Sequence, residues 1–209
     1  MIRLLLALFL LLLPRVALAH PHVFVDAKAD LVYDGSGQIT EVRHEWTFDD
    51  MFSTFAVEGL QQTDGGYSRE TLAPLAKVNI ESLGEFGFFT TGKANGKKLE
   101  FSEPKDYWLS FADKRLTLHF TLPLKAPVPA RNLSVEVYDP TFFVDFTFIR
   151  VNPVKLVGTP DGCKLTVRSS AEANQAATTQ SLSESFFNSL NAQSDFGAQF
   201  ANRAMVFCP

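Results

Sequence analysis

The sequence predicts a mainly β protein of the α+β class: an antiparallel, sandwich-like β domain with a helical insertion and a C-terminal helix. Between Val23 and Tyr33 apolar residues occupy the odd positions, as in a strand with one buried face. Residues 39–48 repeat the alternation after the turn-forming segment 34–37, which predicts an antiparallel hairpin. With 46% apolar and 20% charged residues, the 209-residue chain can bury a full core.

Residues 49–84 predict the helical insertion. Asp49 and Asp50 can cap a helix whose apolar residues recur at a spacing of three and four. Residues 72–83 show the same spacing, although Pro74 cannot sit deep inside a regular helix without removing a hydrogen bond. We therefore expect the second helix to begin just before Pro74 or to kink there.

The rest of the chain predicts short strands and a helical tail. Apolar segments pair around turn residues, 86–91 with 98–101 and 107–111 with 116–122. Four more strands follow: 133–138 and 142–151, which Asp139-Pro140 separates, then 154–157 and 164–168. Three prolines in 123–129 predict an irregular connection. Residues 169–185 lack an apolar period and predict a linker or mobile loop. Residues 186–200 predict a C-terminal helix capped by Ser183 or Ser185.

Residues 1–19 predict a secretory signal peptide, with Arg3 before an apolar run and Ala-Leu-Ala at the end. The apolar run is too short to span a bilayer. The mature protein would be a single domain from His20 to Pro209, exported to the periplasm. Without Arg3 and Arg15 it carries 17 Lys and Arg against 23 Asp and Glu, a net charge of −6. This balance argues against nucleic-acid binding, and no later apolar stretch is long enough to cross a membrane.

Cys163 and Cys208 are the only cysteines of the chain. Export to an oxidising compartment predicts a disulfide between them, which would pin the C-terminal segment. The chain-entropy model gives a loop of this length roughly 4 kcal/mol of stability.

Signal-peptide cleavage after Ala19 would make His20 the first residue, so that its α-amine and imidazole could chelate one metal ion. His22 and Asp26 would project from the same face of an extended strand, and His44 could approach from the neighbouring strand. We interpret His20, His22, His44 and Asp26 as candidate ligands for Zn, Ni, Co or Cu. One alternative is excluded: Cu(II) or Ni(II) bound in a square plane by the N-terminal amine, two deprotonated backbone amides and the imidazole of His22. Pro21 has no N–H to deprotonate, so this plane cannot form. The competing interpretation is a polar start to an edge strand.

Other polar residues have a structural and a functional interpretation. His44 could be a hydrogen-bonded core histidine, and His119 is expected to face solvent. Asp139 and Asp145 are expected to form a salt bridge or turn hydrogen bonds, although Asp145 lies among phenylalanines, where an unpaired carboxylate is costly. No hydrolase, phosphate-loop or dinucleotide motif is present, so we do not expect an enzyme.

Three segments resemble an uncharacterised bacterial family: AHPHVFVD at 19–26, WTFDDMFS at 46–53 and YDPTFFVDF at 138–146, together with the closing Cys208. This family is labelled the periplasmic component of an ABC-type transport system and is otherwise a domain of unknown function. The similarity spans essentially the whole mature chain. Members are often encoded beside nickel/cobalt permeases, which implies a periplasmic accessory to transition-metal transport.

The leading hypothesis is therefore a non-enzymatic periplasmic protein that binds a divalent transition metal for an inner-membrane permease or ABC transporter. Two alternatives remain open. The first is an N-terminal-histidine copper enzyme of the histidine-brace type, which would need a flat, aromatic-lined surface around the terminus. The second is an interaction module that docks on the permease through residues 49–84 and binds no metal.

Overall fold

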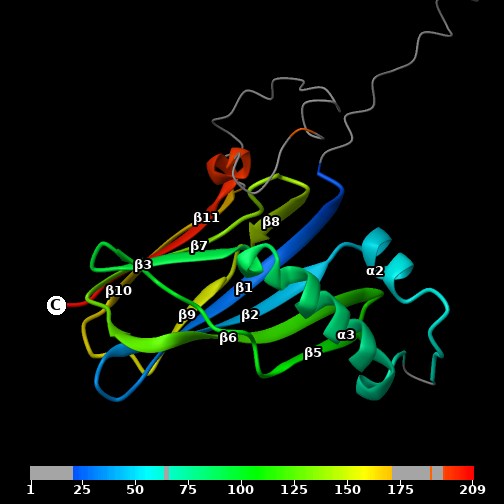
Figure 1. Cartoon of the computed structure of the whole chain (residues 1–209), viewed down its shortest axis with the longest axis horizontal. Helices are drawn as coiled ribbons and strands as arrows, with labels where there is room; N and C mark the ends of the chain where they lie inside the picture. The colour runs from blue at the N-terminus through cyan, green and yellow to red at the C-terminus, as the bar shows by residue number, and fades with distance from the viewer. Residues whose placement is uncertain (1–20, 64–65, 171–188, 190–194) are drawn as a thin grey trace, which may run out of the picture.

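Two β-sheets and two α-helices make up the part of the chain that the structure, a computed structural model, describes: residues 21–63, 66–170, 189 and 195–209 (Figure 1). The predicted mainly β class is confirmed. The signal peptide, His20, nearly all of the predicted linker and about half of the predicted C-terminal helix lie outside the described residues. Within those residues, no helix is long and apolar enough to cross a membrane.

The larger sheet is built around β1. It contains six strands: β1 (Val23–Tyr33), β2 (Gln38–Phe48), β5 (Tyr107–Ala112), β6 (Arg115–Pro129), β8 (Val144–Phe148) and β9 (Val154–Val157). The order is β5-β6-β2-β1-β8, and β9 continues beside β1 after β8. The predicted hairpin of β1 and β2 is confirmed. The strand pairs are predominantly antiparallel, as expected, but β8 and β9 differ because they pair with β1 in parallel.

The smaller sheet is antiparallel. Its order is β10 (Lys164–Arg168), β11 (Asn202–Phe207), β7 (Asn132–Val137), β3 (Thr90–Ala94) and β4 (Lys97–Lys98). The predicted helix over 186–200 is corrected where the structure describes it, since residues 196–200 form a short 3-10 turn, η2, that leads into β11. In β11 a buried Asn202 precedes Ala204 and Val206, so a polar residue interrupts the apolar alternation that marks a strand in the sequence.

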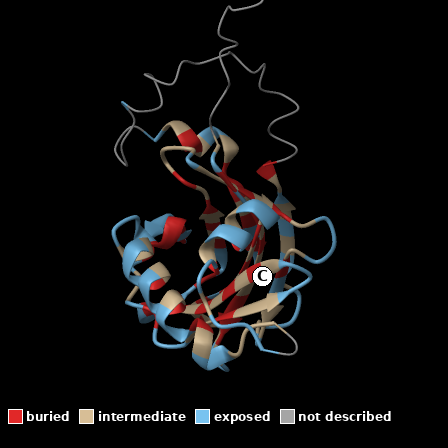
Figure 2. Ribbon diagram, turned by 90° about the vertical axis from the view of Figure 1, so that its right-hand side faces the viewer, coloured by how far each residue is buried: buried red, intermediate tan, exposed pale blue. Residues whose placement is uncertain are grey.

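Both sheets and both helices contribute to a common core (Figure 2). α2 (Asp50–Ala56) is capped by Asp49, as predicted. α3 (Arg69–Gly84) packs against β5 and the 3-10 turn η1 (Gly87–Phe89), and buries Leu72, Ala76 and Ile80. The predicted start of this helix is corrected: Ser68 caps it by accepting a hydrogen bond from Thr71 N–H, so Pro74 falls inside the helix.

The irregular connection predicted at 123–129 is also corrected, because these residues continue β6. The backbone N–H groups of Thr121 and Lys125 point away from β2, toward Asp106 and Glu100. Pro123 lies between these two residues and points the same way, so it lacks an N–H group only on that side. β2 therefore loses no hydrogen-bond donor to Pro123.

Two connections fix β11, one to the segment before β10 and one to the larger sheet. The predicted disulfide joins Cys163, just before β10, to Cys208, just after β11. Asn202 links the sheets: its Oδ1 accepts from the N–H groups of Phe148 and Ser170, and its Nδ2 donates to the carbonyls of Val137 and Phe146.

Candidate functional site

The outward face of β1 and β8, near the start of β1, carries four side chains that we call the N-terminal block: His22, Phe24, Phe143 and Asp145. Val23 and Val25 point into the core, so His22 and Phe24 point outward. Phe24 pairs with Asp145 in the parallel register, and His22 N–H donates to the carbonyl of Phe143 at 2.9 Å. The rings of His22 and Phe143 are 4.7 Å apart.

Asp145 is the chemically unusual member of the N-terminal block. Its Oδ1 is buried and has no hydrogen-bond partner within the described residues. Burial raises the pKa of Asp145 to about 6. From strand spacing and rise, its Cα lies about 8 Å diagonally from that of His22, on the same face. A carboxylate whose charge is poorly compensated gains most when a cation approaches.

The candidate ligand His44 lies elsewhere. It points into the core opposite the buried Ala29, with 3% of its surface exposed. Its Nε2 is 3.2 Å from Thr90 Oγ1, and its ring stacks on Phe120 at 4.7 Å. Burial lowers the pKa of His44 to about 3, so the imidazole is neutral at any physiological pH. His44 therefore lies in the core with its Nε2 beside Thr90, and it does not share a face with His22.

Asp26 lies on the same outward face as His22, as predicted, but its carboxylate is already paired. Arg115 donates to Asp26 Oδ2 at 2.8 Å and also to the backbone carbonyls of Thr47 and Phe48. An arginine fixed by two carbonyls holds the carboxylate strongly, which makes Asp26 a poorer ligand than Asp145. The structure thus brings His22 and Asp26 to one face, excludes His44 from it and adds Asp145.

The remaining polar candidates have structural partners. Asp139 accepts hydrogen bonds from Thr141, Phe143 and Val144, which confirms the predicted turn role and sets the start of β8. His119 faces outward on β6 and stacks on Trp108 at 4.8 Å, three strands away from β8.

Asp49 has a second role that the sequence did not predict. Besides capping α2, its Oδ2 accepts from Phe24 N–H at 2.9 Å, which ties the helix to the first strand.

Replacing Asp145 tests the cost of burying its carboxylate. The folded-state pKa of about 6 exceeds the ordinary value of 3.8, so the folded protein holds this proton more tightly than the unfolded chain. The free energy of unfolding should therefore fall as the pH rises from about 4 to about 7. Asp145→Asn should remove this loss and stabilise the metal-free protein by about 1 kcal/mol above pH 7, after solvent screening, with little effect near pH 4. Urea unfolding across this pH range measures the difference.

The matched control is Asp139→Asn, in the connection that precedes β8. Its carboxylate accepts hydrogen bonds from three backbone N–H groups, so the amide should destabilise the protein. Equal stability of Asp145→Asn and the parent protein at neutral pH would contradict the assigned burial cost.

The N-terminal block can supply an imidazole and a carboxylate to a cation. Among the described residues, no group of three or more His, Cys, Asp or Glu side chains is placed to hold a metal ion. His20, which supplies two further nitrogens in the sequence-based hypothesis, lies outside those residues. A four-ligand site would therefore consist of the His20 amine and imidazole, His22 and Asp145.

Comparison with known proteins gives a family and two relatives. The model of a family described as "Protein of unknown function (DUF1007)" matches residues 5–208. An uncharacterised protein of Haemophilus influenzae is 25% identical over 195 residues, which cover 91% of this chain and 92% of that protein. An uncharacterised 15.5 kDa protein of Spirochaeta aurantia is 35% identical over 100 residues, which cover 47% of this chain and 71% of that protein.

Proposed function

The chain belongs to the DUF1007 family of proteins of unknown function, and we propose that it is an exported protein that binds one divalent transition-metal ion at the N-terminal block. The metal is cargo, which the protein passes to or receives from an inner-membrane permease or ABC transporter. The ligands are the amine and imidazole of His20, the imidazole of His22 and the carboxylate of Asp145. In this proposal the protein is a periplasmic binding protein and not an enzyme.

The observation that carries the proposal is the buried oxygen of Asp145, which has no partner in the described part of the chain and lies on the same face as His22. A buried polar atom without a partner costs stability, which a bound cation would recover. Nitrogen ligands with one carboxylate suit Ni(II), Co(II), Zn(II) and Cu(II) better than Ca(II) or Mg(II). Phe24 and Phe143 flank the position with exposed rings and limit the approach of water.

The test is metal titration of processed protein that begins at His20. The His20→Ala, His22→Ala double variant should lose affinity for Ni(II) by roughly 100-fold or more, measured by calorimetry, because it loses two imidazoles. Asp145→Asn should lose about tenfold, although it is the more stable protein without metal. Zn(II), Co(II) and Cu(II) titrations rank the metals.

The matched control is His119→Ala, which removes a histidine from the same sheet face without touching the N-terminal block. It should bind metal like the parent protein. Equal affinities of the double variant and the parent would contradict metal binding at this site and would leave the permease-docking module as the better interpretation. Native mass spectrometry of the exported protein identifies its first residue and any retained ion.

A further inference from the structure

The outward face of the smaller sheet, which we call the basic face, is defined by the strand register. Leu133, Val135 and Val137 of β7 are buried, so the residues between them point outward. Cross-strand pairing then places Thr166, Met205, Ser134, Lys93 and Lys98 in one row. The neighbouring rows contribute Lys164 beside Phe207, and Arg168 beside Arg203 and Glu136.

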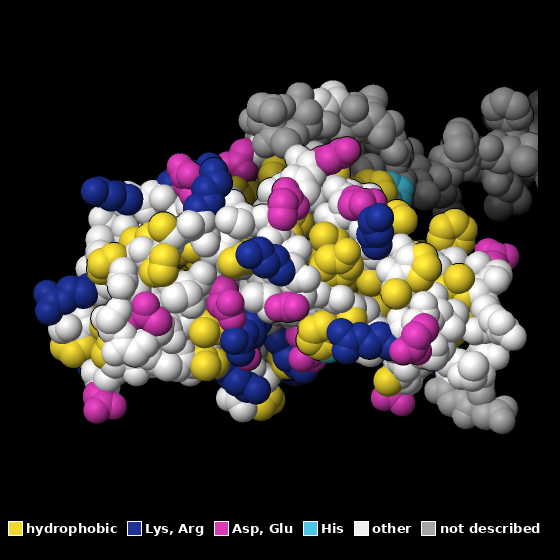
Figure 3. Space-filling model, turned by 60° about the horizontal axis from the view of Figure 1, so that its bottom comes forward, with side chains coloured by type: hydrophobic (Ala, Val, Ile, Leu, Met, Phe, Trp, Pro, Cys, Tyr) yellow, Lys and Arg dark blue, Asp and Glu magenta, His cyan; other side chains and the backbone are white. Residues whose placement is uncertain are grey.

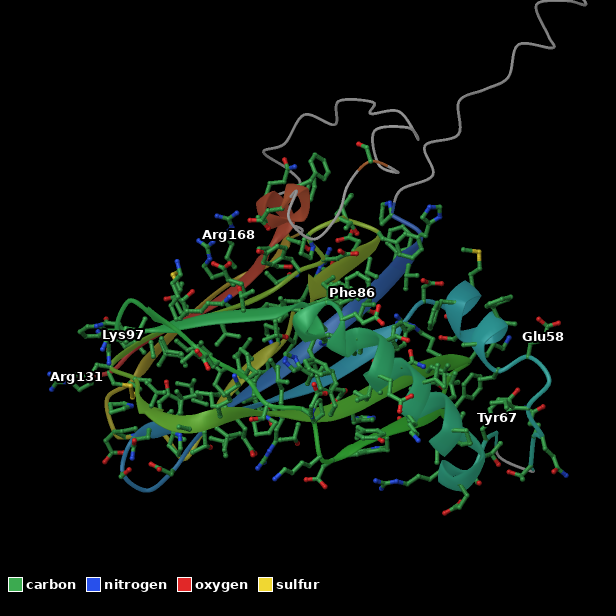
Figure 4. The ribbon with its side chains drawn as sticks, viewed as in Figure 1. Glu58, Tyr67, Phe86, Lys97, Arg131 and Arg168 are labelled. Carbon is green, nitrogen blue, oxygen red and sulfur yellow. A yellow bond between two sulfur atoms is a disulfide. The ribbon has the colours of Figure 1, made fainter. Side chains whose placement is uncertain are left out.

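The basic face has a charge opposite to that of the whole protein. The chain carries a net charge of −4, yet this face carries five cations and one anion: Lys93, Lys98, Lys164, Arg168 and Arg203 against Glu136. Glu136 pairs with Arg203 at 2.6 Å. Within the described residues, no carboxylate lies within ion-pair distance of the other four cations. Lys97 and Arg131 lie at the end of the same sheet (Figure 4).

The outward face of the larger sheet is a natural comparison. There three cations are compensated, since Lys28 pairs with Glu45, Arg43 with Glu41, and Arg115 with Asp26, while Lys155 of β9 has no ion pair within the described residues. Basic and acidic side chains lie side by side in the view of the molecule from below (Figure 3). The uncompensated charge of the basic face is therefore a local property and not a general feature of the surface.

Exposed apolar side chains lie among the cations of the basic face. Met205 is 42% exposed and Phe207 is 56% exposed, both on β11, which lies between β10 and β7. Together with Lys93, Ser134 and Lys164 they line a shallow hollow of about 520 Å³. Uncompensated lysines around exposed apolar tips are typical of surfaces that sit on a membrane, where cations meet headgroup phosphates and apolar side chains enter the interface.

We propose that the basic face docks the protein on a lipid membrane whose surface is anionic. Lysine predominates among the unpaired cations. The hydrated point charge of a lysine ammonium suits a fluid layer of phosphates better than the planar guanidinium of arginine, which tends to fix one carboxylate partner. The face is open, so it suits an extended plane better than a compact ligand. Docking is independent of metal binding, since the residues of the basic face belong to the other sheet.

The experiment is co-sedimentation of the processed protein with vesicles. Vesicles of phosphatidylcholine alone should bind little protein, and vesicles in which phosphatidylglycerol replaces a third of the lipid should bind it in a salt-sensitive way. The double variant Lys93→Gln, Lys164→Gln should weaken vesicle binding by about 25-fold, because each basic residue near an anionic membrane contributes about fivefold to the affinity. Met205→Ser with Phe207→Ser should also weaken binding, and circular dichroism verifies that each variant is folded.

The matched control, Lys28→Gln with Lys155→Gln, removes the same charge from the other sheet and should leave binding unchanged. Three outcomes would overturn the proposal: no binding to phosphatidylglycerol vesicles, binding that both double lysine variants lower equally, or binding of polyglutamate without binding of vesicles. The last result would identify an acidic protein partner instead. Inorganic phosphate should not compete as a specific ligand. If it displaces the protein from vesicles only at high ionic strength, the result would support the membrane surface as the ligand.

Discussion

Asn202→Ala should destabilise the protein by about 4 kcal/mol, because this side chain satisfies four buried backbone groups at once. Alanine would leave the N–H groups of Phe148 and Ser170 and the carbonyls of Val137 and Phe146 without these partners. The loss should appear as a lower urea midpoint with an unchanged denaturant slope. Because Phe146 is next to Asp145, the variant should also alter the pH dependence attributed to Asp145.

Asn132→Ala is the matched control for this prediction. Asn132 is exposed on the neighbouring strand β7, and its backbone pairs with Phe207 in the same sheet. Its replacement should change the free energy of unfolding by less than about 0.5 kcal/mol, as expected at an exposed position. Similar losses in both variants would show that the loss at Asn202 is a property of asparagine in this sheet and not of the four hydrogen bonds.

Cys163→Ser with Cys208→Ser should cost about 4 kcal/mol, since the disulfide joins residues 45 positions apart and restricts the unfolded chain. Guanidinium unfolding of the oxidised parent protein and of the double variant measures the difference. A reductant should lower the stability of the parent protein and leave the double variant unaffected. Equal stabilities would contradict a role in stabilisation.

The disulfide variant also bears on the basic face. Lys164 pairs with Phe207, and each is directly next to one of the bonded cysteines. Without the bond, the paired ends of β10 and β11 lose their covalent link and keep only the strand pairing and the core packing of Leu165 and Val206. We therefore expect vesicle binding to weaken at temperatures at which the rest of the variant is still folded.

Much of the fold could be predicted because its signals are local. The alternation in 23–33, the turn at 34–37 and the caps Asp49 and Ser68 each act within a few residues, and all of them are present in the structure. Ser68 nevertheless escaped the prediction, because attention to Pro74 suggested a later start of α3. The strand β11 was missed, since its buried Asn202 has partners 32 to 65 residues away that no local pattern reveals.

The candidate site was predicted only in part, for a related reason. The outward direction of His22 and Asp26 follows from strand alternation alone. The parallel pairing of β1 with β8, which places Asp145 beside Phe24, joins segments 121 residues apart and has no local signature. For His44, alternation correctly indicated the apolar side of β2, and this position already favoured the core over a metal site.

The prolines of β6 also bear on self-association. Residues 100–102 hydrogen-bond to β6 near Leu124, and farther along the strand Pro127 and Pro129 have no N–H group. A strand of a second copy that tried to extend the sheet there would meet alternate positions without an N–H donor. This margin is therefore a poor template for fibril growth, which favours separate molecules at high protein concentration.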